Sequence, residues 1–258
     1  MISLFSLFDL RDDLRKPGCP ICQIRWKSAW RYLSFLLYES VNDGETRLRF
    51  WAGIGYCPDH TDMLTAISRK DNVKPLGMNI LYESLAGLVK EAVTEYPIPR
   101  KRPNLLRLLI LRVLTGYFST NNYKDLMPIS TCRVCQIADE SALTGLETLM
   151  QCLQDPEEKV YTLYPNSDGI CLPHLRIALQ KFATQYPSAA SILKDHAKNR
   201  LAHWEQAMGE YIRKQAWQNR LEKVTDEEEK ALQRALAFFT GDRPSAFILH
   251  PYQPAPRG

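Results

Sequence analysis

The sequence has no apolar run long enough to cross a membrane. Its most apolar stretch, residues 105–118, is 14 residues long and contains Arg107 and Arg112, whereas a membrane-spanning helix needs about 20 predominantly apolar residues. The first residues, MISLFSLFDLRDDL, place no basic residue ahead of their short apolar run, so they do not resemble a secretory signal. We therefore expect a cytoplasmic protein whose thiols stay reduced.

Neither sign of charge dominates. The chain has 258 residues, with 33 Lys and Arg against 29 Asp and Glu and a formal net charge of +4. This is far below the basic excess of a dedicated nucleic-acid-binding protein. With 45% hydrophobic and 24% charged residues, the composition is that of an ordinary folded protein and excludes a fully disordered chain.

Common catalytic motifs are also missing. The chain contains no P-loop, GxGxxG, HExxH or GxSxG pattern. Of the histidines outside the pattern described next, His196 and His203 fall on an expected helix and His250 in a proline-rich tail. The sequence therefore predicts no catalytic and no cofactor-binding residues, and we expect a protein that is not an enzyme.

The cysteines, although only seven, form a repeated pattern. Each of two sets reads C-x2-C followed by C-x2-H, and the second set recurs 113 to 114 residues after the first. The first set is Cys19, Cys22, Cys57 and His60, and the second is Cys132, Cys135, Cys171 and His174. We expect each set to form its own four-ligand site. Cys152 falls outside the pattern, as a buried small side chain or a reactive thiol.

Zinc is the metal that this donor set favours. Three thiolates and one imidazole suit a closed tetrahedral site, so we predict two structural Zn²⁺ ions per chain. Gly55 and Gly169 each precede a ligand by two residues, and Pro58 and Pro173 favour helix starts within the C-x2-H pairs. Packed core cysteines, a redox C-x-x-C centre and an iron–sulfur cluster remain as alternatives.

Helical spacing of apolar residues dominates the rest of the chain, and strand-like alternation is absent. We predict a mainly α protein with two homologous zinc-stabilised helical modules, a long C-terminal helix, and few or no strands. The long helix should begin near Ser188 and reach Leu221, and Thr225 should cap a last helix that Gly241 ends. The expected segments are a first module at 1–100, a linker and apolar helix at 101–128, a second module at 129–186, C-terminal helices at 187–242 and a tail at 243–258.

The duplicated motif resembles that of a family of uncharacterised bacterial proteins with a CPxC…GxCxxH arrangement. The matching pieces are Cys19-Pro-Ile-Cys22, Gly55-Tyr-Cys57-Pro-Asp-His60, Cys132-Arg-Val-Cys135 and Gly169-Ile-Cys171-Leu-Pro-His174. Because that family has no known function, the resemblance implies the duplicated metal-site architecture and no activity, substrate or partner.

The functional prediction is a zinc-binding scaffold or adaptor that binds another protein or a second copy of itself. One alternative is a nucleic-acid-binding regulator that uses the basic segment Arg100-Lys101-Arg102. Another is a thiol-based metal or redox sensor. Affinity that falls steeply with salt would favour the first alternative, and loss of zinc under mild oxidation the second.

Overall fold

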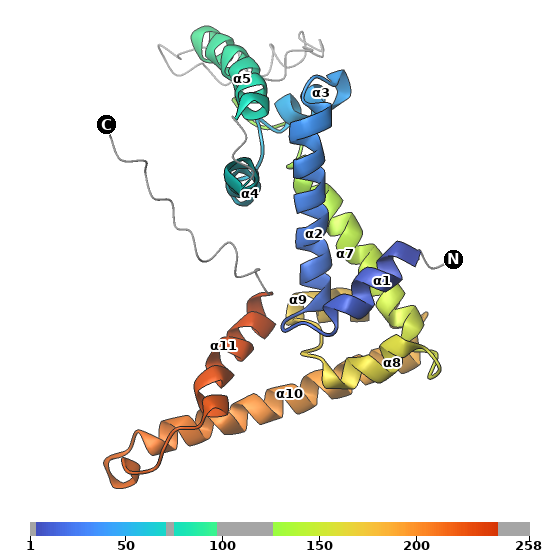
Figure 1. Cartoon of the computed structure of the whole chain (residues 1–258), viewed down its shortest axis with the longest axis vertical. Helices are drawn as coiled ribbons and strands as arrows, with labels where there is room; N and C mark the ends of the chain where they lie inside the picture. Colours follow the sequence, from blue (N-terminus) through green and yellow to red (C-terminus); the bar gives the residue numbers. More distant parts are fainter. Residues whose placement is uncertain (1–3, 71–74, 97–125, 242–258) are drawn as a thin grey trace, which may run out of the picture. The chain divides into compact units, whose positions relative to one another are not determined.

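The computed structural model describes residues 4–70, 75–96 and 126–241, and this part of the chain is helical without strands (Figure 1). The α-helices are α1 (Leu4–Asp13), α2 (Pro20–Phe35), α3 (Gly44–Ala52), α4 (Pro58–Lys70), α5 (Leu76–Glu95), α7 (Arg133–Cys152), α8 (Lys159–Leu163), α9 (Leu172–Phe182), α10 (Pro187–Lys214) and α11 (Asp226–Thr240). The predicted mainly α fold is confirmed.

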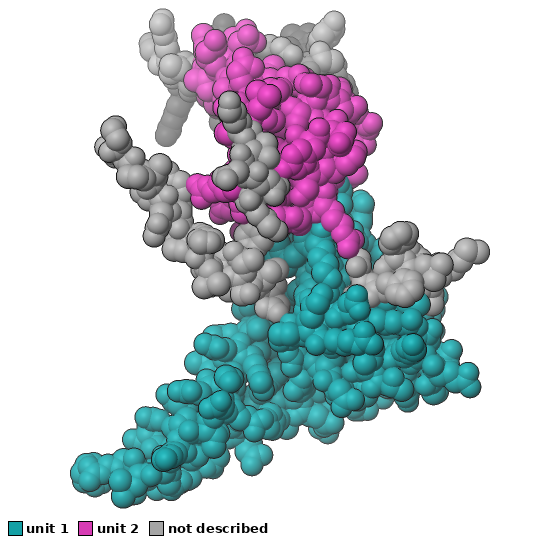
Figure 2. All heavy atoms as spheres, viewed as in Figure 1, with its two compact units in different colours: residues 1–29, 137–258 teal, residues 30–136 magenta. Residues whose placement is uncertain are grey.

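The chain forms two compact units (Figure 2). Unit 1 comprises residues 1–29 and 137–258, and unit 2 comprises residues 30–136. Helix α2 therefore begins in unit 1 and ends in unit 2, whereas α7 begins in unit 2 and ends in unit 1. Each unit thus contains residues from both halves of the duplicated sequence.

The core of unit 1 is built around α10. Apolar residues of this helix, among them Leu193, Ala197 and Trp204, are buried, and α11 folds back along α10 (Figure 1). Their packing brings the rings of Trp204 and Phe238 within 5.7 Å. Helix α10 ends at Lys214 rather than at Leu221, because the residues beyond it are exposed and turn through a short 3₁₀ segment instead of adding buried apolar contacts.

The predicted cap of α11 is present. The Thr225 side chain accepts a hydrogen bond from the backbone N–H of Glu228, and the Glu228 carboxylate accepts one from the N–H of Thr225. Gly241 ends the helix with φ +85°, a conformation that favours glycine. Both ends of α11 are therefore specified by residues recognisable in the sequence.

Helices α2 and α7 run antiparallel where they meet in unit 1. The hydroxyls of Ser28 and Ser141 are 2.6 Å apart, and earlier along α2 the side chain of Ile24 packs on Gly145, further along α7. A Cβ added to Gly145 would lie 2.9 Å from an Ile24 methyl. A glycine at this position therefore allows the two helices to approach closely.

Unit 2 has a small core of aromatic and aliphatic side chains. Phe50 of α3 is buried and packs edge-on against Tyr56 and Tyr82, with ring centroids 5.0 and 5.2 Å away. Met63 and Leu64 of α4 are fully buried as well. Gly55, two residues before Cys57, lies against Phe50 and Tyr82 of this core.

Several sequence predictions lie outside the described residues. They include the apolar helix at 105–118, the basic segment at 100–102 and the tail at 243–258. None of the described helices combines the length and the hydropathy needed to cross a membrane.

Candidate metal centres

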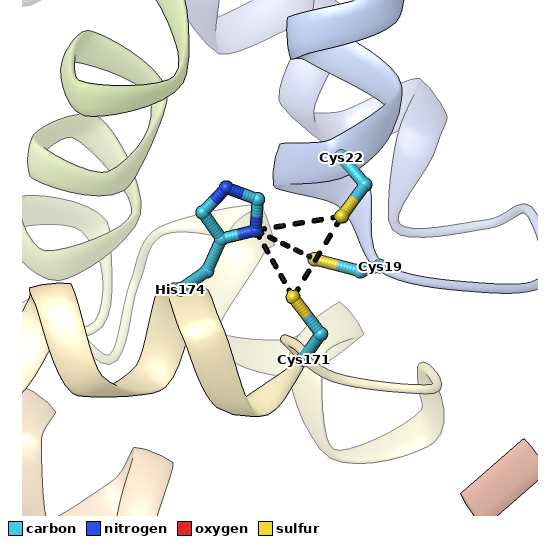
Figure 3. A group of neighbouring side chains, drawn as sticks. All are labelled: Cys19, Cys22, Cys171 and His174. Carbon is cyan, nitrogen blue, oxygen red and sulfur yellow. Dashed lines mark hydrogen bonds between the residues drawn. The ribbon is translucent and has the colours of Figure 1, made fainter. Parts of the chain in front are cut away.

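Unit 1 brings together four donor residues from two helix starts (Figure 3). Cys19 and Cys22 lie at the beginning of α2, and Cys171 and His174 at the beginning of α9. The Nδ1 atom of His174 lies 3.5 Å from Sγ of Cys19, 3.5 Å from Sγ of Cys22 and 3.1 Å from Sγ of Cys171. All four residues are buried. They form a closed Cys3His cluster.

Unit 2 contains a second Cys3His cluster, formed by Cys57 and His60 at the start of α4 and by Cys132 and Cys135 at the start of α7. The Nδ1 atom of His60 lies 3.1 Å from Sγ of Cys57, 3.6 Å from Sγ of Cys132 and 3.3 Å from Sγ of Cys135. His60 is buried, whereas the three cysteines are partly exposed.

The spacing of the donor atoms fits a tetrahedral zinc ion. Zinc bonds of about 2.3 Å to sulfur and 2.0–2.1 Å to nitrogen require edges of about 3.8 Å between sulfurs and about 3.6 Å between sulfur and nitrogen. The observed sulfur–sulfur distances are 3.7 Å for Cys22 and Cys171 and 3.6 Å for Cys57 and Cys135. A disulfide would need about 2.0 Å, so neither of these pairs is a disulfide.

The structure corrects one prediction about these residues. We expected Cys19 and Cys22 to share a site with Cys57 and His60, and the second set to form a site of its own. Instead, each C-x2-C pair joins the C-x2-H pair of the other repeat. All eight predicted residues lie in the two clusters, but their grouping is crossed.

The physical reason is the stiffness of the helix that follows each C-x2-C pair. Helix α2 has 16 residues and α7 has 20, which correspond to about 24 Å and 30 Å of rise. A helix of that length carries the chain away from the pair at its start. Because α2 and α7 run in opposite directions, the C-x2-H pair that follows one helix meets the start of the other.

A family model described as a family of unknown function (DUF6062) matches residues 7–246. The chain belongs to this family. The match confirms the resemblance to a family without known function, and it covers both clusters. No curated protein and no solved structure matches the chain.

In this DUF6062 protein, the unit 1 cluster stabilises one thiolate strongly. Hydrogen bonds from Cys171 and Cys19 hold the pKa of Cys22 well below its usual range. Burial raises the pKa of Cys19. A hydrogen bond with Cys19 lowers the pKa of Cys171, but hydrogen bonding to Cys22 and burial outweigh it and raise that pKa to about 12. A divalent cation would offset the repulsion between neighbouring thiolates, so all three thiols could ionise.

In the unit 2 cluster, too, one thiol has a lowered pKa and the other two have raised pKa values. Burial tends to raise the pKa of Cys132, but hydrogen bonds from His60 and from backbone N–H groups lower it to about 6. Burial and the nearby Cys132 charge raise the pKa of Cys135 to about 12, and burial raises that of Cys57. Both clusters therefore have the donor chemistry of a site for a thiophilic cation.

A carboxylate ties together the two halves of the unit 1 cluster. Asp168 accepts a hydrogen bond of 2.8 Å from the backbone N–H of Gly18, next to Cys19. Its other oxygen accepts one of 2.7 Å from Arg200 of α10, which also donates to the carbonyl of Ser167. Asp168 thus links the loop before α2, the loop before α9 and the long helix α10. Asp168 was not predicted from the repeated pattern, because the first repeat has Ile54 at the equivalent position.

Two glycines allow the C-terminal helices to approach this cluster. Gly169 has φ +71°, and a Cβ there would lie 2.6 Å from Nδ1 of His196 on α10. Gly241, at the end of α11, lies against the sulfurs: its Cβ would be 3.6 Å from Sγ of Cys22 and 3.8 Å from Sγ of Cys171. Both α10 and α11 therefore close over the unit 1 cluster.

In unit 2, backbone hydrogen bonds join the two segments that carry the cluster residues. The carbonyl of Ala52 accepts hydrogen bonds from the N–H groups of Ile129, at 2.8 Å, and Ser130, at 3.2 Å. Between Ala52 and Cys57 the chain turns through Ile54, whose φ is +49°, an unfavourable conformation for a β-branched residue.

The remaining candidates do not join either cluster. Cys152 is buried in the core of unit 1, and burial raises its pKa to about 11, which fits a packed side chain. His203 pairs with Glu227 at 2.8 Å, so it connects α10 to α11.

Proposed function

We propose that the two clusters each hold a structural Zn²⁺ ion and that the protein is a non-enzymatic scaffold that binds another protein. The crossed, four-donor geometry of the clusters supports the first part. With four protein ligands a tetrahedral ion has no open position for substrate, so the metal would fix chain segments rather than catalyse a reaction. The ions would be held by Cys19, Cys22, Cys171 and His174 in unit 1 and by Cys57, His60, Cys132 and Cys135 in unit 2.

Elemental analysis of the purified full chain tests the metal assignment. We expect two zinc ions per chain, and we expect prolonged treatment with a strong chelator to reduce helical circular dichroism, because binding and folding are coupled in such sites. A chain that folds and remains equally stable without any bound metal would refute the assignment.

The scaffold role is supported by an apolar stripe on α11, which we define as Leu232, Leu236 and Phe239. These side chains are 56%, 52% and 50% exposed and follow the spacing of one helix face. Ala231 and Phe238 lie about 100° around the helix from the stripe and are buried. A contiguous exposed apolar surface of this kind is typical of a protein-binding site.

The charges beside this stripe indicate what a partner should present. The first turn of α11 contains four carboxylates, three of which already pair with Lys230, His203 and Lys214. A partner with an apolar surface flanked by basic side chains would complement both the stripe and the net negative charge of this turn.

Affinity capture from native cells, followed by titration of the purified partner, tests this role. Replacement of an apolar residue with a charged one, Leu236→Glu, should abolish binding, whereas Gln233→Glu, an exposed position on the same helix, should preserve it. Equal binding by both variants would exclude the stripe as the interface. Binding that instead falls by orders of magnitude with added salt and requires nucleic acid would favour the regulator that uses Arg100-Lys101-Arg102.

A further inference from the structure

The cysteine side chains of the two clusters differ in accessibility. In unit 1, Cys19 and Cys22 are 5% exposed and Cys171 is 2% exposed. In unit 2, Cys57, Cys132 and Cys135 are all partly exposed, and the histidine is the buried ligand. A reagent must contact sulfur to react with it, so small oxidants reach the unit 2 thiolates more readily.

The surroundings of the clusters also leave the unit 2 cluster less protected than the unit 1 cluster. In unit 1, Asp168 joins both ligand segments to Arg200, and Gly241 places the end of α11 against the sulfurs. At the position equivalent to Asp168, unit 2 has Ile54 in a left-handed conformation, which is strained for this residue. The loop before Cys57 would therefore relax if its ligand were released.

We propose that the unit 2 cluster is a peroxide-responsive switch that releases its zinc on oxidation, while the unit 1 cluster keeps its own. This inference rests on the zinc assignment proposed above. It gives the two centres different roles, with unit 1 maintaining the fold and unit 2 responding to oxidants.

The reaction uses the neighbouring sulfurs of Cys57 and Cys135 in unit 2. The thiolate of Cys57 attacks one oxygen of the peroxide and breaks the O–O bond, which forms a sulfenic acid and releases hydroxide. The thiolate of Cys135, whose sulfur lies 3.6 Å away, then attacks that sulfur, forms the disulfide and releases a second hydroxide. The two thiolates lose two electrons, and the peroxide gains them. The ion keeps only Cys132 and His60 as ligands and dissociates as Zn²⁺.

The test uses the wild-type holoprotein, a few equivalents of hydrogen peroxide and a chromogenic zinc chelator. We expect one zinc ion per chain to leave about tenfold faster than the other. Mass spectrometry after denaturing alkylation should find Cys57 and Cys135 in a disulfide and Cys19, Cys22 and Cys171 alkylated. Dithiothreitol and added zinc should restore the second ion. Release of both ions at one rate, earlier release from unit 1 or no release would overturn the proposal.

Two controls make the result specific. The Cys152→Ala variant removes the thiol that is not a ligand, and it should release zinc at the wild-type rate; release that depends on Cys152 would overturn the proposal. Zinc content is measured before oxidation. Protein that contains no zinc refutes the metal assignment itself, whereas protein with two zinc ions that both resist peroxide refutes only the switch.

Discussion

The two clusters have the same donors at nearly the same distances, but different surroundings. In unit 1 the ligands are buried, and the side chains of Asp168 and Arg200 link the segments that carry them. In unit 2 the cysteines are partly exposed, and the ligand segments are joined by backbone hydrogen bonds to Ala52. The comparison shows that the repeated pattern supplies the clustered side chains, whereas residues outside the pattern determine how well each cluster is protected.

Removal of one ligand tests the crossed grouping. Cys57→Ser should reduce bound zinc from two ions to one and make Cys132 and Cys135 reactive toward an alkylating reagent. Cys19 and Cys22 should stay protected. This is the largest expected effect, because a structural zinc contributes on the order of 10 kcal/mol in model peptides.

Alkylation followed by mass spectrometry measures this result, and Cys171→Ser is the matched variant in unit 1. That substitution should make Cys19 and Cys22 reactive instead. If Cys57→Ser exposed Cys19 and Cys22, the grouping described for the two units would be wrong.

The two equivalent glycines provide the next comparison. Gly169→Ala should destabilise unit 1 by on the order of 3 kcal/mol, because it combines left-handed backbone strain with a clash against His196. Gly55→Ala should cost only about 1–2 kcal/mol, since its Cβ would lie 3.4 Å from the nearest side-chain atom, on Leu85. Chemical denaturation of the zinc-loaded proteins measures both. Equal losses of stability would show that the close contact between Gly169 and α10 has no effect on stability.

The carboxylate link is the third difference to test. Asp168→Ala should cost about 2 kcal/mol, because it leaves the N–H of Gly18 and the guanidinium of Arg200 without this acceptor. It should also speed loss of zinc from unit 1 to a chelator. Asp139→Ala is the control: its side chain is 64% exposed and pairs with Arg25, so it should cost less than about 1 kcal/mol. If the two variants lost the same stability, Asp168 would not contribute to the better protection of unit 1.

Helix caps give the smallest effect and report on each unit separately. Thr225→Ala removes the side-chain cap of α11 in unit 1, and Asp43→Ala removes that of α3 in unit 2. Each should cost about 1 kcal/mol. Hydrogen exchange should detect each loss mainly in the unit that contains the cap; equal changes in both units would mean that they unfold as one.

Much of this structure was predictable from local sequence signals. The spacing of apolar residues predicted a mainly helical fold and the long helix α10, and Thr225 predicted the start of α11. All eight clustered residues followed from the two repeated motifs. These features depend on residues close together in the chain, so a single sequence is enough to reveal them.

The grouping of the ligands and their protection were not predictable in this way. Grouping depends on the opposite directions of α2 and α7, which is a tertiary property. The contacts of Asp168 with Gly18, 150 residues away in the sequence, and of His196 with Gly169 depend on how distant segments pack. Helices α1 and α3 were also missed, because with 10 and 9 residues each is too short for its apolar spacing to be distinctive.

The crossed grouping of the ligand pairs has a parallel in swapped dimers. Each repeat contributes a C-x2-C pair to one centre and a C-x2-H pair to the other, which is the topology of a swapped homodimer whose two protomers have been fused after gene duplication. An isolated repeat would hold two half-sites and would need a second copy to complete either of them. Deletion of one repeat would therefore open both centres at once.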